Sequence, residues 1–103
     1  MTEFYDRENQ PIEDADGTLA VIRWARMYED NEYRQVKVTP LDEKRKAWVS
    51  TIWTGFDVYG NGEYPAIFET MQFENDRPVD DPVRHHKEAD AIEYHDQLVA
   101  AWH

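Results

Sequence analysis

The sequence predicts an α+β fold in which a three- or four-stranded antiparallel sheet, arranged as a meander, carries two helices, with the C-terminal helix packed on the sheet. Two runs rich in β-branched and aromatic residues flank a glycine-containing turn at 59–63, which is typical of a β-hairpin. Two other stretches repeat apolar residues at helical spacing. A chain of 103 residues is long enough for one such domain. The expected elements are a ribbon at 3–12, helices at 18–29 and 87–102, and strands at 33–39, 46–56 and 65–74.

The first helix is predicted from the stretch 18–29, TLAVIRWARMYE. In it Val21, Trp24, Ala25 and Tyr28 lie at positions i, i+3, i+4 and i+7, so they form one stripe on a helix. The stripe has the residue types of a ligand platform, but we interpret it as core packing, which is the usual role of such aromatic side chains.

The hairpin strands carry large apolar side chains on both of their faces. In the strand at 46–56 one face holds Trp48, Ser50, Ile52 and Thr54, and the other holds Val49, Thr51 and Trp53. This pattern indicates either a central strand with packing on each side or a strand with an amphipathic outer face. Pro40 is expected to end the preceding strand, and Pro65 is expected to open the third one.

Glu69 lies on an apolar face of its strand, between Ile67 and Met71. If that face is the core, the carboxylate must be paired, hydrogen-bonded or protonated. One interpretation is an acid in a functional site. The interpretation we favour is a structural carboxylate that binds a hydroxyl, a tryptophan N–H or an arginine.

The last third of the chain is predicted to be an acidic loop followed by a helix. The segment 74–82, ENDRPVDDP, is acidic and contains two prolines, which is typical of a solvent-exposed loop. Its aspartates lack the ligand spacing and the glycine of a calcium-binding loop, so we do not interpret them as a metal site. The helical side chains expected to line up along the apolar face are Ala91, His95, Leu98 and Trp102.

The net charge of −11, from 22 acidic and 11 basic residues, limits the classes of partner. A chain this acidic repels phosphate backbones and anionic lipid surfaces, so we expect it to bind no nucleic acid and no membrane. The acidic surface either keeps the protein soluble and monomeric or binds a basic protein partner. The oligomeric state does not follow from the charge.

The absence of cysteine excludes disulfides, thiol catalysis and zinc–thiolate sites. The first residues lack the basic start and apolar run of a signal peptide. The longest aliphatic run, at 19–22, is too short to span a membrane. We therefore expect a cytoplasmic protein.

No motif for catalysis, for a cofactor or for a metal is present at the required spacing. The four histidines form no His-x-x-x-His or His-Glu-x-x-His pair, and no glycine-rich loop precedes a helix. No serine or threonine occupies a Gly-x-Ser-x-Gly elbow. We interpret His95 as a histidine at the core edge that is hydrogen-bonded to the sheet. A site assembled from distant parts, such as His95 with Asp57 or Glu69, remains an alternative.

Four blocks of the chain occur in a characteristic order: YDRENQPI, WARMYEDNEYRQV, VSTIWTGFDVYGNGEYPAIFETMQF and EADAIEYHDQLVAAW. In this order, and above all in V-S-T-x-W-x-G-x-D and P-x-I-F-E-T-M, the chain resembles a group of short uncharacterised proteins of bacteria and bacteriophages. The resemblance covers nearly the whole chain. It implies one compact α+β domain of cytoplasmic or phage-expressed origin, and it implies no activity. The chain departs from the group at Val58, where the group has a histidine, and at Tyr94, where the group has a glycine.

Three hypotheses follow for the function. The first is a small acidic interaction protein, of bacterial or phage origin, that acts on a basic host or partner protein and is not an enzyme. The second is a small-ligand binder or enzyme with a site near Asp57, Glu69, Thr70 and His95. The third is a structural homo-oligomer joined through the sheet edge. The candidate ligand or interaction residues, taken from the motif positions shared with the group, are Ser50, Thr51, Gly55, Asp57, Glu69, Thr70 and His95.

Overall fold

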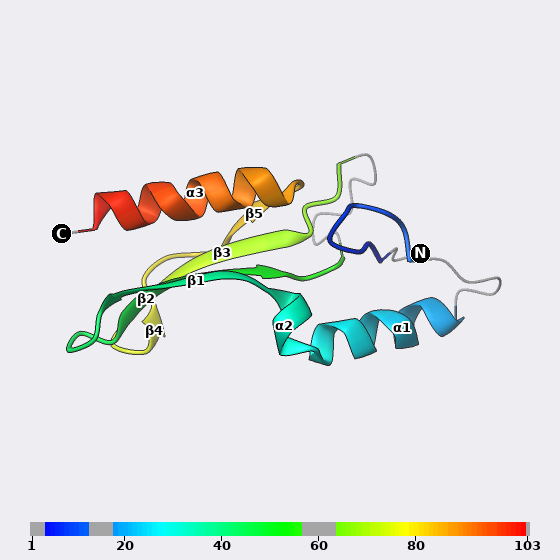
Figure 1. Cartoon of the computed structure of the whole chain (residues 1–103), viewed down its shortest axis with the longest axis horizontal. Coiled ribbons are helices and arrows are strands. Elements are labelled where there is room, and N and C mark those ends of the chain that lie inside the picture. Colours follow the sequence, from blue (N-terminus) through cyan, green and yellow to red (C-terminus); the bar gives the residue numbers. More distant parts are fainter. Residues whose placement is uncertain (1–3, 13–17, 57–63, 103) are drawn as a thin grey trace.

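The computed structural model describes residues 4–12, 18–56 and 64–102, and they form the α+β fold that the sequence predicts (Figure 1). The sheet is antiparallel, with strand order β1-β2-β3-β4, and β5 also pairs with β3. Helix α3 contacts β1, β2 and β3, which confirms the expected position of the C-terminal helix. In chain order the elements are α1 (Thr18–Glu29), α2 (Asn31–Arg34), β1 (Gln35–Asp42), β2 (Ala47–Trp53), β3 (Phe68–Glu74), β4 (Arg77–Pro78), β5 (Val83–His85) and α3 (Glu88–Ala101).

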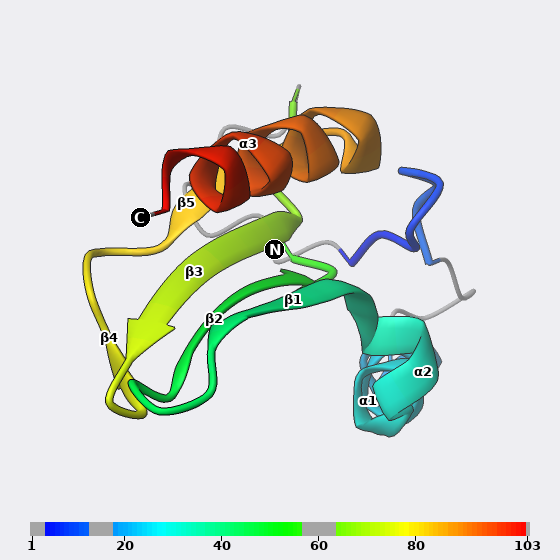
Figure 2. The ribbon, with the colours of Figure 1, turned by 60° about the vertical axis from the view of Figure 1, so that its left-hand side comes forward.

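The two faces of the sheet differ in burial because a helix covers only one of them. Along β2 the residues that face α3 are buried, and the residues between them keep some exposure. The same alternation begins in β3, where Phe68 and Thr70 are buried and Glu69 and Met71 are partly exposed. Figure 2 shows α3 along one side of the curved sheet, with α1 and α2 beyond its end.

Both ends of strand β1 differ from the predicted ends. It runs through Pro40 to Asp42, although Pro40 was expected to end it. The missing N–H of proline is tolerated because β1 is an edge strand, and the register shifts between Pro40 and Asp42. At its start, the residues expected as a turn and as the first strand positions form the short helix α2, whose N–H groups are capped by the Asp30 carboxylate.

The other strands are shorter and more numerous than expected. Strand β2 ends at Trp53 rather than at residue 56, and β3 begins at Phe68 rather than at Pro65. The segment expected as a solvent-exposed loop contains β4, and β5 follows it, so the described sheet has five strands. Both additional strands are too short for sequence alternation to reveal them.

Helix α1 has the predicted bounds, and Trp24 and Tyr28 of the expected stripe pack against the core, but Val21 does not. Its Val21, expected in the core stripe, is 43% exposed, whereas Ala20 is buried and Met27 packs against the core. The reason is Trp24, whose indole N–H donates to the Thr54 carbonyl at 2.8 Å. This long-range bond sets the rotation of α1 about its axis.

The N-terminal ribbon closes the core at the end of the sheet. Tyr5 N–H donates to the Gly55 carbonyl at 2.7 Å, and Ile12 N–H donates to the Phe4 carbonyl at 2.7 Å. The fully buried Trp53 donates its indole N–H to the Tyr5 carbonyl at 2.9 Å. The ribbon thus caps the largest core side chain. Among the described residues, no helix is both long enough and apolar enough to cross a membrane.

Candidate functional site

Three of the candidate residues belong to one buried polar chain between α3 and the sheet. The His95 ring lies 2.8 Å through Nδ1 from the Thr51 hydroxyl, and that hydroxyl lies 2.7 Å from the Thr70 hydroxyl. On the other side of the ring, Nε2 lies 2.8 Å from the Thr39 hydroxyl. Cross-strand pairing of Thr51 with Thr70 places both hydroxyls under the helix. Each member of the chain is therefore held by a hydrogen bond.

Three of the four members of this chain, which we call the sealed polar chain, are closed off from solvent, and Thr39 at its outer end keeps some exposure. His95 and Thr51 are 0% exposed and Thr70 is 1% exposed. Burial lowers the pKa of His95, the positive charge of Lys37 lowers it further, and the Asp96 carboxylate opposes the shift. Burial thus favours the neutral form of His95, which joins α3 directly to β1 and β2 and through Thr51 to β3, as expected for a histidine hydrogen-bonded to the sheet. No substrate reaches its ring atoms in this arrangement.

Glu69 lies on the opposite face of the sheet from His95. It neighbours Thr70 in β3, so its side chain points to the other side of the pleat. Its carboxylate lies 3.2 Å from the Arg84 guanidinium, which comes from the cross-strand position of β5. The pairing with arginine is one of the structural roles expected for this carboxylate. Glu69 and His95 therefore do not share a pocket.

Gly55 has a structural role that its backbone explains. Its φ of +81° favours glycine, and a Cβ there would come within 2.5 Å of Trp24 Nε1 and 2.6 Å of Trp53 Cζ2. The glycine lets two indoles meet beside the N-terminal ribbon. Of the remaining candidates, Ser50 is partly exposed on the face away from α3, and Asp57 lies outside the described residues.

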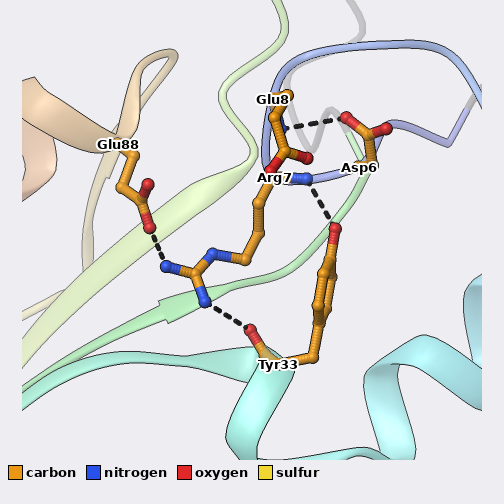
Figure 3. A network of polar contacts seen from close by, with 5 residues as sticks. All are labelled: Asp6, Arg7, Glu8, Tyr33 and Glu88. Carbon is orange, nitrogen blue, oxygen red and sulfur yellow. Dashed lines mark hydrogen bonds and ion pairs between the residues drawn. The ribbon is translucent and has the colours of Figure 1, made fainter.

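A second polar cluster joins the N-terminal ribbon to α2 and α3 (Figure 3). The Arg7 guanidinium forms an ion pair with Glu88 and donates to the Tyr33 carbonyl at 3.0 Å. The Arg7 backbone N–H donates to the Tyr33 hydroxyl at 2.9 Å, and the guanidinium carbon lies 5.7 Å from the Tyr33 ring centre. Burial is the largest effect on Tyr33 and raises the pKa of its hydroxyl. Since every group has a partner within the chain, the cluster acts as a structural clamp.

The face of the sheet away from α3, which we call the open face, carries apolar side chains from β1, β2 and β3 with the polar Ser50 and Glu69 among them. Its cross-strand pairs include Pro40 with Trp48 and Trp48 with Phe73. The rings of Trp48 and Phe73 stack with their centres 4.8 Å apart. None of its members is buried, and Val38 is 44% exposed. The apolar residues of the open face are Val38, Pro40, Trp48, Ile52, Met71 and Phe73.

A recess borders the open face where two turns meet, at the end of the sheet far from α1 (Figure 1). The Asn75 N–H donates to the Arg45 carbonyl at 2.8 Å, which holds the β3–β4 turn against the β1–β2 turn. Most of the recess lining is apolar. The recess is lined by Pro40, Ala47 and Trp48 and by the charged residues Asp42, Glu43, Lys46 and Asp76.

In the described part of the chain, no three histidine, aspartate or glutamate side chains lie close enough together to bind a metal ion. Comparisons of the chain with protein families, with curated proteins and with solved structures find no match. The site must therefore be judged from its own geometry.

Sequence reasoning named Thr51, Thr70 and His95 as candidates and left open an amphipathic outer face on the second strand, but it did not identify the open face or the recess as a site. The signal for the open face was present, because Trp48 and Ile52 lie on the opposite side of β2 from Val49 and Trp53. For the recess the sequence carries no comparable signal. It depends on two turns that are about 30 residues apart meeting in space, as the hydrogen bond between Asn75 and Arg45 shows.

Proposed function

We propose that this protein is a binding protein that contacts a basic protein partner through the open face of its sheet. The observation that carries the proposal is the row of six apolar side chains that no described helix or strand covers. Contiguous apolar patches on a small protein mark interaction sites more often than they mark ordinary surface. The stacked pair of Trp48 and Phe73 supplies the aromatic area that protein interfaces favour.

The acidic charge of this chain favours a basic partner. The chain carries a net charge of −11, and helix α3 contributes Glu88, Asp90, Glu93 and Asp96 without any lysine or arginine. The net charge attracts a basic partner and repels a second copy of the same acidic chain, and α3 contributes to it from the other side of the sheet from the open face. Charge thus favours a basic partner over self-association through the open face.

A catalytic role has less support than a binding role. The candidate residues Thr51, Thr70 and His95 bind one another in the interior, and Glu69 pairs with Arg84 on the other side of the sheet. We propose a partner in the bacterial cytoplasm, and this part of the proposal is supported by the resemblance to short proteins of bacteria and bacteriophages. Among the described candidate residues, the buried polar side chains and Glu69 share no cleft that could hold a substrate.

The proposal is tested with two variants that each introduce one positive charge. Val38→Arg places a positive charge on the open face, and Val79→Arg is the matched control, because Val79 is 52% exposed in a loop outside that face. A partner captured from bacterial lysate is purified, and its affinity for each variant is measured by calorimetry at low and at high salt. We expect Val38→Arg to weaken binding about tenfold or more beyond the control, because like charges at an interface cost several kcal/mol.

Two results would contradict the proposal. Equal affinities of the two arginine variants would show that the open face is not the contact surface. A complex that does not weaken with salt would show that the partner is not held by charge. Light scattering provides a third check, since a wild-type dimer that Val38→Arg dissociates would make the open face a self-interface instead.

A further inference from the structure

We propose that the recess between the β1–β2 and β3–β4 turns binds an arginine side chain of the partner. This inference rests on the proposed function and deepens it, because it names the group that is recognised and the place where it binds. The recess is continuous with the open face through Pro40 and Trp48. A segment lying across the open face would therefore reach the recess with its next side chain.

The indole of Trp48 provides an apolar wall for the recess. Phe73 stacks on the indole at 15° between the ring planes and does not line the recess. The stacking holds the indole in place, and Trp48 is one of the residues that line the recess. A cation beside a tryptophan face is attracted by the ring quadrupole. The wall is therefore ready to receive a flat guanidinium.

Carboxylates surround this wall in excess over positive charge. Asp42, Glu43 and Asp76 line the recess with one lysine, Lys46, whose ammonium lies 3.4 Å from the Asp76 carboxylate. Asp42 also accepts backbone N–H bonds within its turn, at 2.9 Å from Lys44 and 3.2 Å from Arg45. With three carboxylates and one lysine, the recess keeps a net negative charge. Charge complementarity therefore selects a cationic side chain as the occupant.

The protein already uses the same combination of groups for its own arginines. The Arg45 guanidinium lies 4.7 Å from the Trp102 ring centre and pairs with Glu74. Arg7 likewise meets an aromatic ring and a carboxylate at once, in the cluster of Figure 3. The recess also combines a tryptophan with carboxylates, but none of its lining residues is an arginine of this chain. Arginine fits better than lysine because its planar fork can stack and bind a carboxylate in two places.

The experiment uses a pentapeptide that alternates valine and arginine, and the same peptide with neutral citrulline in place of arginine. Binding to the full chain is followed by NMR. The Trp48 indole N–H and the Asp76 amide report on the recess, and the Val38 and Met71 amides report on the rest of the open face. We expect the arginine peptide to shift both groups of signals. The citrulline peptide should bind about tenfold more weakly, as expected from one stacked cation and its exposed carboxylate partners.

Variants of the rim separate local contacts from the general acidity of the chain. The double variant Glu43→Gln with Asp76→Asn should weaken the arginine peptide by about three- to tenfold and leave the citrulline peptide unchanged. Asparagine suits residue 76, where φ is +61°. The matched control is Asp90→Asn with Glu93→Gln, which removes two exposed carboxylates of α3. Conversely, Lys46→Asn should tighten binding of the arginine peptide.

The outcomes distinguish this inference from the proposed function. Shifts at Val38 and Met71 without shifts in the recess, together with equal binding of both peptides, would overturn the arginine site and leave the open face as the interface. Equal effects of the rim and α3 variants would overturn it too, because general acidity would then explain the binding. Shifts confined to the recess would support the arginine site and count against the open face.

Discussion

Replacing Thr51 by valine tests whether the sealed polar chain is structural. Valine keeps the shape of threonine, but it removes the hydroxyl that lies 2.8 Å from His95 Nδ1 and 2.7 Å from the Thr70 hydroxyl. Two buried polar groups then lose a partner, and each such loss costs about 1–3 kcal/mol. We therefore expect Thr51→Val to lower the free energy of unfolding by about 2–5 kcal/mol.

A double-mutant cycle makes this magnitude specific to the chain of hydrogen bonds. Thr70→Val removes only the last group, so it should cost about 1 kcal/mol, since Thr51 keeps its bond to His95. In the double variant the Thr70 hydroxyl is no longer left unpaired. Its cost should therefore be smaller than the sum of the single costs, by about 1 kcal/mol or more. Ser50→Ala, on the partly exposed open face, is the control and should change stability by less than about 0.5 kcal/mol.

Urea denaturation followed by circular dichroism measures these free energies. With an m value of about 1–3 kcal/mol per molar urea, the Thr51→Val midpoint should fall by roughly one molar or more. The reasoning would be refuted if Thr51→Val were as stable as Ser50→Ala, or if the two valine substitutions were additive. A loss of partner binding by a folded Thr51→Val protein would return this residue to the list of functional candidates.

Two other predictions concern the same interior. The folded state lowers the pKa of His95, so between the unfolded value near 6.5 and the lower folded value the unfolded chain binds more protons. The free energy of unfolding should therefore be highest above that pH range and should fall as the pH decreases through it. Urea titrations at several pH values should show a weaker dependence of stability on pH in His95→Gln. An unchanged pH dependence in that variant would assign the effect to other titratable groups. Gly55→Ala should cost about 2–5 kcal/mol, from its positive φ and its contact with two indoles. Adding Trp24→Phe should recover part of that loss in thermal unfolding, and additivity of the two changes would contradict the proposed clash.

The helices illustrate what local pattern predicts well. Both long helices occur within a residue of their expected ends, since the spacing of apolar side chains is a property of nearby residues in the chain. His95 also has the predicted role, because a polar ring in an apolar stripe needs partners on the sheet. The prediction that Val21 lies in the core was wrong, because the rotation of α1 depends on the hydrogen bond from Trp24 to Thr54, 30 residues away.

The strands illustrate where local pattern fails. Pro40 was expected to end its strand, but an edge position makes the missing N–H harmless, and strand order cannot be read from neighbouring residues. The sequence predicted that Glu69 binds a hydroxyl, a tryptophan N–H or an arginine. The partner is Arg84, because β5 pairs with β3 and brings that arginine beside Glu69. In both cases the decisive contact joins segments that are distant in the chain.

The sequence by itself determined the α+β class, the principal helices and strands, the acidic charge and the exclusion of cysteine chemistry. Only the tertiary structure decided which face of the hairpin is buried. A period of two assigns Trp48 and Trp53 to opposite faces but treats both faces alike. Helix α3 covers the side of Trp53, and among the described elements none covers the side of Trp48. The surface that we propose for binding therefore exists because one helix packs on one side of a sheet whose strands are apolar on both.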